Sequence, residues 1–75
     1  MPEQTPPCKV VKRSVKIAGH ATSVTLEAAF WTALEKIAAE RGLSMNALIA
    51  EVDATNKGKC TLSAALRVYI LERVT

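Results

Sequence analysis

The chain has 75 residues, and a domain of this length buries only about 60% of the surface that its unfolded chain exposes. Small domains make up the shortfall with disulfides, metals or oligomerisation. Two cysteines and one histidine are too few for a secreted disulfide scaffold or a tetrahedral zinc site. We therefore expect free thiols, no metal and no cofactor, and we expect the protein to form oligomers.

The formal net charge is only +3, and its distribution is more informative than its size. Lys9, Lys12, Arg13 and Lys16 fall within one short segment that contains no acidic residue, a pattern typical of nucleic-acid binding. A solvated basic arm is the alternative. No apolar run approaches the ~20 residues of a membrane span, and the start of the chain lacks the layout of a signal peptide, so we expect a cytoplasmic protein with no membrane partner.

The N-terminal part of the chain is predicted to form an arm followed by a hairpin. Three prolines within residues 1–8 predict a flexible arm over 1–9, leaving 10–75 as the folded domain. Alternating residues predict strands over Val10–Ile17 and Thr22–Leu26, joined by a turn at Ala18–Ala21. Such a short turn favours pairing of the two strands within one chain, although pairing across two subunits stays open.

Helical spacing follows from Glu27 to Arg41, and Gly42 is expected to end this helix. Ser44 is a suitable N-cap for a second helix over 45–54, and Thr61 for a third over 62–73. Because a strand cannot satisfy its own backbone groups and the third helix is apolar over much of its circumference, we expect a second copy of the chain to cover both. The predicted dimer core consists of the inward apolar residues Val24, Leu26, Phe30, Trp31, Leu34, Ile37, Leu48, Ile49, Val52, Leu66, Tyr69 and Ile70.

The strand at Thr22–Leu26, the helix after it, the Gly42-Leu43-Ser44 junction and the next helix together resemble the ribbon-helix-helix family of bacterial DNA-binding proteins. The N-terminal strand and the third helix resemble a short subgroup of that family. The resemblance implies an α+β homodimer with three helices in each chain. In that family two strands pair antiparallel across a twofold axis, and the resulting ribbon enters the major groove of double-stranded DNA.

The resemblance assigns base reading to the strand residues that alternate away from the core, which are Ala21, Ser23 and Thr25. These side chains are short, and long forked groups make the bidentate contacts that discriminate bases best. We therefore expect weak direct readout, supplemented by the basic segment of Lys9, Lys12, Arg13 and Lys16. The start of the second helix, at Ser44, Met45 and Asn46, would bind a DNA phosphate, with a plain helix cap as the alternative.

These features predict sequence-dependent binding of double-stranded DNA by a homodimeric transcriptional repressor that could also assemble into higher-order complexes on DNA. An enzyme is not expected, because His20 has no carboxylate close in sequence and the cysteines are far apart. Two alternatives remain. The first is an interaction module that keeps the fold without reading DNA, and the second is an antitoxin with a protein partner. We rank the antitoxin lower, because antitoxins of this kind usually extend further after the last helix.

Overall fold

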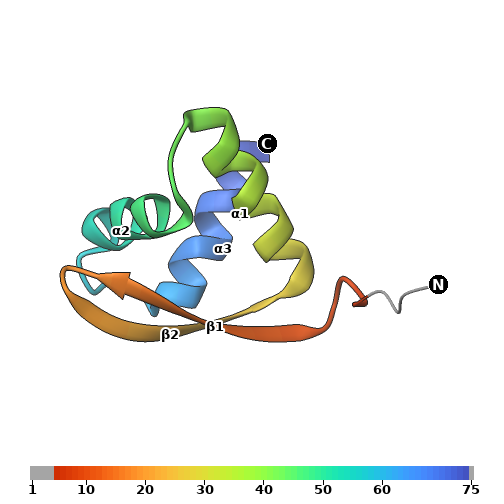
Figure 1. The fold of residues 1–75 in the computed structure, drawn as a ribbon, viewed down its shortest axis with the longest axis horizontal. Coiled ribbons are helices and arrows are strands. Elements are labelled where there is room, and N and C mark those ends of the chain that lie inside the picture. The colour runs from red at the N-terminus through yellow and green to blue at the C-terminus, as the bar shows by residue number, and fades with distance from the viewer. Residues whose placement is uncertain (1–4, 75) are drawn as a thin grey trace.

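The computed structural model describes residues 5–74 and consists of a two-stranded hairpin covered on one face by three helices (Figure 1). The elements in chain order are β1 (Val10–Ile17), β2 (His20–Glu27), α1 (Ala28–Arg41), α2 (Met45–Asn56) and α3 (Leu62–Val74). This order of two antiparallel strands followed by three helices confirms the predicted fold class. Pairing between two copies of the chain stays a prediction.

β1 and β2 pair with each other within the chain, as the short turn had favoured. The register places Ile17 opposite His20, so the turn is only Ala18-Gly19, and the predicted turn at Ala18–Ala21 was two residues too long. Both turn residues have positive φ, +52° at Ala18 and +82° at Gly19. This is the requirement of a type I′ turn, whose twist matches that of the strands it joins and lets β2 begin at once.

Ala18 is the strained position of this turn, because an alanine at positive φ costs roughly 1 kcal/mol. Asparagine tolerates this conformation far better and is preferred before glycine in type I′ turns. Ala18→Asn should therefore raise the free energy of unfolding by up to about 1 kcal/mol, or roughly 4–8 °C in Tm. Urea unfolding checks this. Equal or lower stability would show that the turn is not the strained element described here.

The helix ends follow their sequence signals closely. Gly42 ends α1 at φ +67°, and the Leu43 N–H donates to the Ala38 carbonyl at 2.8 Å. The Ser44 hydroxyl accepts from Ala47 N at 3.1 Å, and the Thr61 hydroxyl accepts from Ala64 N at 3.2 Å.

The second helix is two residues longer than predicted, because Asn56 organises the loop that follows it. The Asn56 side chain donates to the Cys60 carbonyl at 2.7 Å and accepts from its N–H at 3.1 Å. Lys57, at φ +51°, then ends α2. The last helix is one residue longer than predicted and reaches Val74, whereas the first begins at Ala28 because Glu27 stays in β2.

The predicted arm over 1–9 falls partly within the described residues, and its last part is bonded to α1. The Lys9 carbonyl accepts from Ala28 N at 2.8 Å, and the Pro7 carbonyl accepts from Ala29 N at 3.0 Å. The hairpin register causes this contact, since Val10 lies opposite Glu27 and the preceding residues therefore reach the first turn of α1. These carbonyls satisfy helix N–H groups that the Glu27 side chain leaves uncapped. Residues 1–4 of the arm and Thr75 of the predicted domain lie outside the described residues.

The core lies between the hairpin and the helices, and one chain encloses it. Of the twelve residues predicted to form a dimer core, all except Phe30 and Tyr69 are buried, and those two are partly buried against the rest. Val15 of β1 and Ala38 of α1 complete the buried set. A second copy is thus not needed to cover these side chains, so the argument for a dimer moves to other surfaces. No helix within residues 5–74 has the length and apolar character needed to span a membrane.

Candidate nucleic-acid interface

The two faces of the hairpin differ completely in their surroundings. Residues directly opposite in an antiparallel pair point to the same face, and one face packs against the helices through Val15, Val24 and Leu26. Four cross-strand pairs belong to the other face, and the first of them, Val10 with Glu27, lies at the end of the hairpin next to α1. The remaining three pairs are exposed and are called the outer face below: Lys12 with Thr25, Ser14 with Ser23, and Lys16 with Ala21. The predicted base-reading residues and two of the predicted basic residues therefore share one surface.

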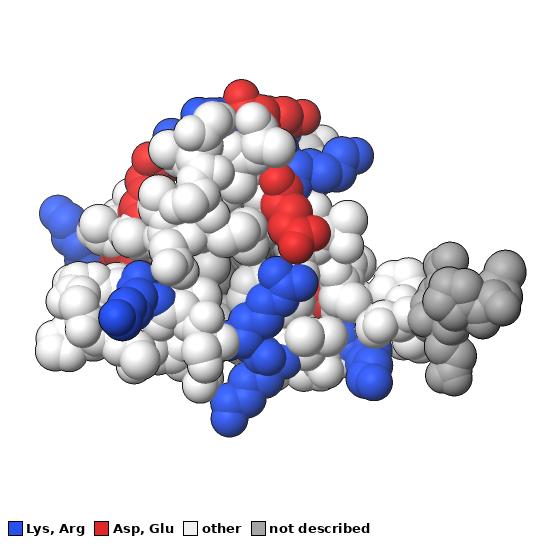
Figure 2. Space-filling model, in the orientation of Figure 1, with Lys and Arg blue, Asp and Glu red and all other residues white. Residues whose placement is uncertain are grey.

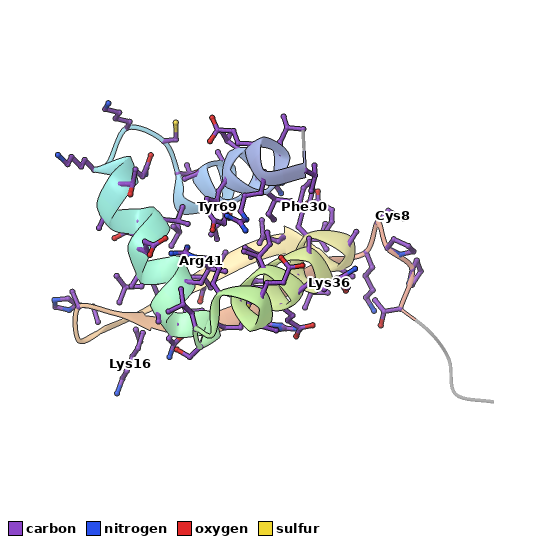
Figure 3. The ribbon with its side chains drawn as sticks, turned by 90° about the horizontal axis from the view of Figure 1, so that it is seen from above. Cys8, Lys16, Phe30, Lys36, Arg41 and Tyr69 are labelled. Atoms are coloured by element: carbon purple, nitrogen blue, oxygen red, sulfur yellow. The ribbon has the colours of Figure 1, made fainter. Side chains whose placement is uncertain are left out.

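No acidic residue belongs to these three pairs. Figure 2 shows Lys and Arg side chains along the lower part of the molecule, over the hairpin, and acidic side chains mainly over the helices above it. In Figure 3 the Lys16 side chain extends away from the helices. The outer face is thus a basic and polar surface. A polyanion bound there would meet no acidic side chain from Lys12–Lys16 of β1 or from Ala21–Thr25 of β2.

Arg13 lies on the opposite face from Lys12 and Lys16. Its guanidinium carbon is 4.8 Å from the centre of the Trp31 ring, and its Nη1 is 3.3 Å from the Glu35 carboxylate. The Arg13 charge is therefore stacked on an aromatic ring and balanced by an acid. Lys9, the remaining member of the predicted basic segment, is exposed just before β1.

Trp31 fixes the position of β1 relative to α1. The indole is 2% exposed, and its Nε1–H donates to the Val11 carbonyl at 2.9 Å. A buried Trp N–H normally finds such a partner, and here the partner belongs to the strand that carries both outer lysines. Trp31 therefore supports the interface from the buried side.

The N-terminal turn of α2 is the second predicted DNA contact. Ser44 is exposed and already accepts a hydrogen bond from Ala47 N at 3.1 Å, so its own O–H is left to donate. The N–H groups of Met45 and Asn46 belong to the first turn, where a helix offers donors and positive potential. α2 packs against β1, and in Figure 3 its first turn lies at the same edge of the molecule as Lys16.

The three helices are joined by a polar cluster centred on Arg41, at the end of α1. Its guanidinium forms a two-pronged ion pair with Glu51 of α2, with Nη2 2.9 Å from Oε1, and Nη1 lies 3.1 Å from the Tyr69 hydroxyl of α3. The hydrogen bond from Arg41 holds the pKa of Glu51 below its usual value. Two residues before Tyr69 in α3, Arg67 bonds Glu27 at 2.9 Å. The pKa of Glu27 is lowered by a backbone hydrogen bond and by Arg67.

Acid should weaken the fold through these carboxylates. A carboxyl whose folded pKa is depressed contributes stability above its unfolded value, about 4.5, and this contribution disappears as the pH falls through the folded pKa. Glu51→Gln should therefore flatten the loss of stability between pH 5 and pH 3, as measured by urea unfolding. Glu40→Gln, which removes the same charge from an exposed position on α1, should keep the wild-type slope. Equal slopes for both variants would exclude Glu51 as a source of the dependence.

Comparison with known proteins decides the family. The model of the ribbon-helix-helix domain matches residues 10–74, which include the hairpin and all three helices. The chain belongs to the ribbon-helix-helix family. Its structure is also similar to that of an uncharacterized protein from Bordetella pertussis Tohama I, with a TM-score of 0.76 and 33% sequence identity. The alignment covers 92% of this chain and 58% of that one. No match is found among curated proteins.

Membership of the ribbon-helix-helix family confirms the resemblance inferred from the sequence and supports a DNA-binding or regulatory role at the level of the family. Within this fold, Ser14 is an outer-face residue that the predicted site omitted. It lies opposite Ser23 and between the two outer lysines. The two-residue period of β1 carries this signal, since Lys12, Ser14 and Lys16 must share a face once Val15 is buried.

Proposed function

We propose that the protein is a homodimer that binds double-stranded DNA through the major groove and regulates transcription, acting as a repressor. The observation that carries this proposal is the outer face of the hairpin, where Lys12 and Lys16 flank a row of small polar side chains. The acidic residue of the next pair, Glu27, is neutralised by Arg67 of α3. Family membership supports the same conclusion, because pairing of two strands into a groove-binding ribbon is characteristic of ribbon-helix-helix proteins.

In the proposed dimer, the spacing between strands assigns base contacts to β2 and phosphate contacts to β1. Paired strands lie about 4.8 Å apart, so two adjacent β2 strands form a ribbon narrow enough for the major groove, which is about 12 Å wide. The flanking β1 strands of such a dimer would lie roughly 14 Å from each other, three strand spacings apart. We infer that Ala21, Ser23 and Thr25 of β2 face the bases, while the lysines of β1 meet the phosphates along both walls of the groove.

This division of tasks favours affinity over direct readout. Ser23 and Thr25 have short hydroxyl side chains that hydrogen bond to any base, and Ala21 offers only a methyl group. The long cationic side chains belong to β1, where they neutralise phosphates and release counterions. We expect strong salt dependence, with a sequence preference that depends partly on the shape of the groove.

Phosphate binding at the start of α2 would fix the register of the hairpin on the duplex. The free O–H of Ser44 and the first N–H groups of α2 are suited to one phosphate oxygen in each subunit. These contacts carry no sequence information, and they would act together with Lys12 and Lys16 on the neighbouring backbone.

Selection from a randomised duplex library tests the proposal. The full chain should enrich sites with twofold symmetry at low salt, because two identical subunits read two half-sites. A chain with Lys12 and Lys16 both replaced by glutamate should enrich none, and it provides the matched background. If the wild-type chain, verified as folded by circular dichroism, retains no duplex above that background at low salt, the proposal is wrong and an interaction module without DNA binding is favoured.

A further inference from the structure

One cation of the hairpin, Arg13, is exposed although it shares a face of β1 with the buried core. It directly follows Lys12, and consecutive Cα atoms are about 3.8 Å apart, but alternation directs the two side chains to opposite faces of the strand. The Arg13 guanidinium lies over the Trp31 ring and contacts the Glu35 carboxylate. The side chains of Arg13 and Glu35 are 44% and 52% exposed, so both remain accessible to a ligand.

The ion pair between Arg13 and Glu35 is looser than the one between Arg41 and Glu51. The Arg41 guanidinium contacts both carboxylate oxygens of Glu51, whereas Arg13 contacts Glu35 through one nitrogen and one oxygen at 3.3 Å. Exposed ion pairs contribute little to stability, because water competes for both groups. A guanidinium also carries five N–H donors, so Arg13 has donors that this single contact does not use.

Trp31 orients Arg13 independently of Glu35. A guanidinium stacked on an aromatic ring contacts the ring with its face and keeps its N–H groups at the edge of the planar group. Trp31 itself is fixed by its burial and by its hydrogen bond to the Val11 carbonyl. Arg13 can therefore exchange one anion for another while it remains on the ring.

The DNA backbone of the proposed complex passes close to this ion pair. Arg13 is exposed whereas its cross-strand neighbour Val24 is 1% exposed, so Arg13 faces the edge of β1 that lies away from β2. Lys12 and Lys16 would reach phosphates from the outer face, and the first turn of α2 would reach them from the side of the helices (Figure 3). A backbone that touches both groups follows this edge of β1, where Glu35 is also exposed.

We propose that Glu35 is a built-in competitor of the DNA backbone, which binds Arg13 in the free protein and is replaced by a phosphate in the complex. The inference rests on the DNA binding of the proposed function and adds a phosphate contact to each subunit beside Lys12 and Lys16. A phosphate accepts from two N–H groups of a guanidinium at once, which is a stronger contact than the single one to Glu35. Because the ion pair must be broken first, Glu35 lowers the affinity for every duplex and leaves the sequence preference unchanged.

Fluorescence anisotropy with one labelled duplex at several salt concentrations tests the proposal. Glu35→Gln frees Arg13 in both subunits and should bind about three- to tenfold more tightly than the wild type. Its salt dependence should be that of the wild type, because the contacts in the complex are the same. Arg13→Ala should bind more weakly, with a slope of log affinity against log salt that is shallower by about 2, since a dimer loses two phosphate contacts.

Two controls separate the exchange at Arg13 from a general effect of charge. Glu40→Gln removes the same charge from another exposed position on α1 and should stay within about twofold of the wild type, since salt screens distant charges. The double variant Arg13→Ala/Glu35→Gln should bind within about twofold of Arg13→Ala, because Glu35 then has no cation to release. Circular dichroism verifies that each variant is folded.

Three results would overturn the exchange: a gain from Glu35→Gln no larger than that from Glu40→Gln, a gain that persists without Arg13, or a wild-type salt slope in Arg13→Ala. A wild type that binds no duplex rejects the proposed function together with this inference. A wild type that binds the duplex while Glu35→Gln binds equally well rejects this inference alone.

Discussion

Replacing Lys12 and Lys16 with alanine is expected to weaken duplex binding by at least about tenfold at moderate salt and to flatten its salt dependence. The two lysines lie on the outer face of β1, so a dimer would lose four phosphate contacts. Each contact contributes ~0.9 to the slope of log affinity against log salt, and the slope should therefore become shallower by about 3 to 4. Fluorescence anisotropy with a labelled duplex at several salt concentrations measures both effects.

Lys36 provides a control of equal charge. It is exposed on α1, which packs on the opposite face of the hairpin, and its position is labelled in Figure 3. The single variant Lys36→Ala should change the salt slope much less than Lys16→Ala, although both remove one positive charge from each chain. An effect of Lys36→Ala as large as that of Lys16→Ala would mean that net charge alone drives binding and that the outer face has no special role.

The largest effect on stability is expected at Trp31. Its indole is buried, donates to the Val11 carbonyl and supports the stacked guanidinium of Arg13. Truncation of a buried aromatic side chain costs about 3–5 kcal/mol, and a domain of this size has few kcal/mol in reserve. Trp31→Ala should therefore lower Tm by more than 10 °C or unfold the chain at room temperature, as followed by circular dichroism.

Two further variants separate the roles of the indole. Trp31→Phe keeps an aromatic ring and removes the donor to Val11, so it should cost on the order of 1–3 kcal/mol, since the missing donor and the smaller ring both contribute. Thr32→Ala changes the exposed neighbour on the same helix and should stay within about 0.5 kcal/mol of the wild type. A Trp31→Ala chain as stable as the Thr32→Ala control would contradict the packing described here.

The elements could be predicted from the sequence wherever a local signal determines them. Gly42, Ser44 and Thr61 end or begin helices through hydrogen bonds with their immediate neighbours. The turn was predicted two residues too long, because Ala18 adopts a positive φ that alanine rarely takes. The end of α2 depends on a side-chain bond from Asn56 to Cys60, which lies outside the helical pattern.

Contacts between distant segments were less accessible from the sequence. Arg13 contacts Glu35 and Trp31 and so joins β1 to α1. From its charge alone, Arg13 was predicted to contact DNA in the same way as Lys12 and Lys16. The alternation of β1 separates them, because Arg13 shares a face with the buried Val15. The sequence also could not predict that a single chain buries the residues expected in a dimer core. An apolar stripe on a helix does not reveal whether the same chain or a second copy covers it.

The most direct test of DNA binding by the outer face is an NMR titration of the isotopically labelled full chain with a short duplex at low salt. Amide shifts should concentrate on Lys12–Lys16, on Ala21–Thr25 and on the first turn of α2, while the amides of α3 stay unchanged. Absence of shifts at saturating duplex, or shifts confined to residues outside those segments, would contradict the interface described here.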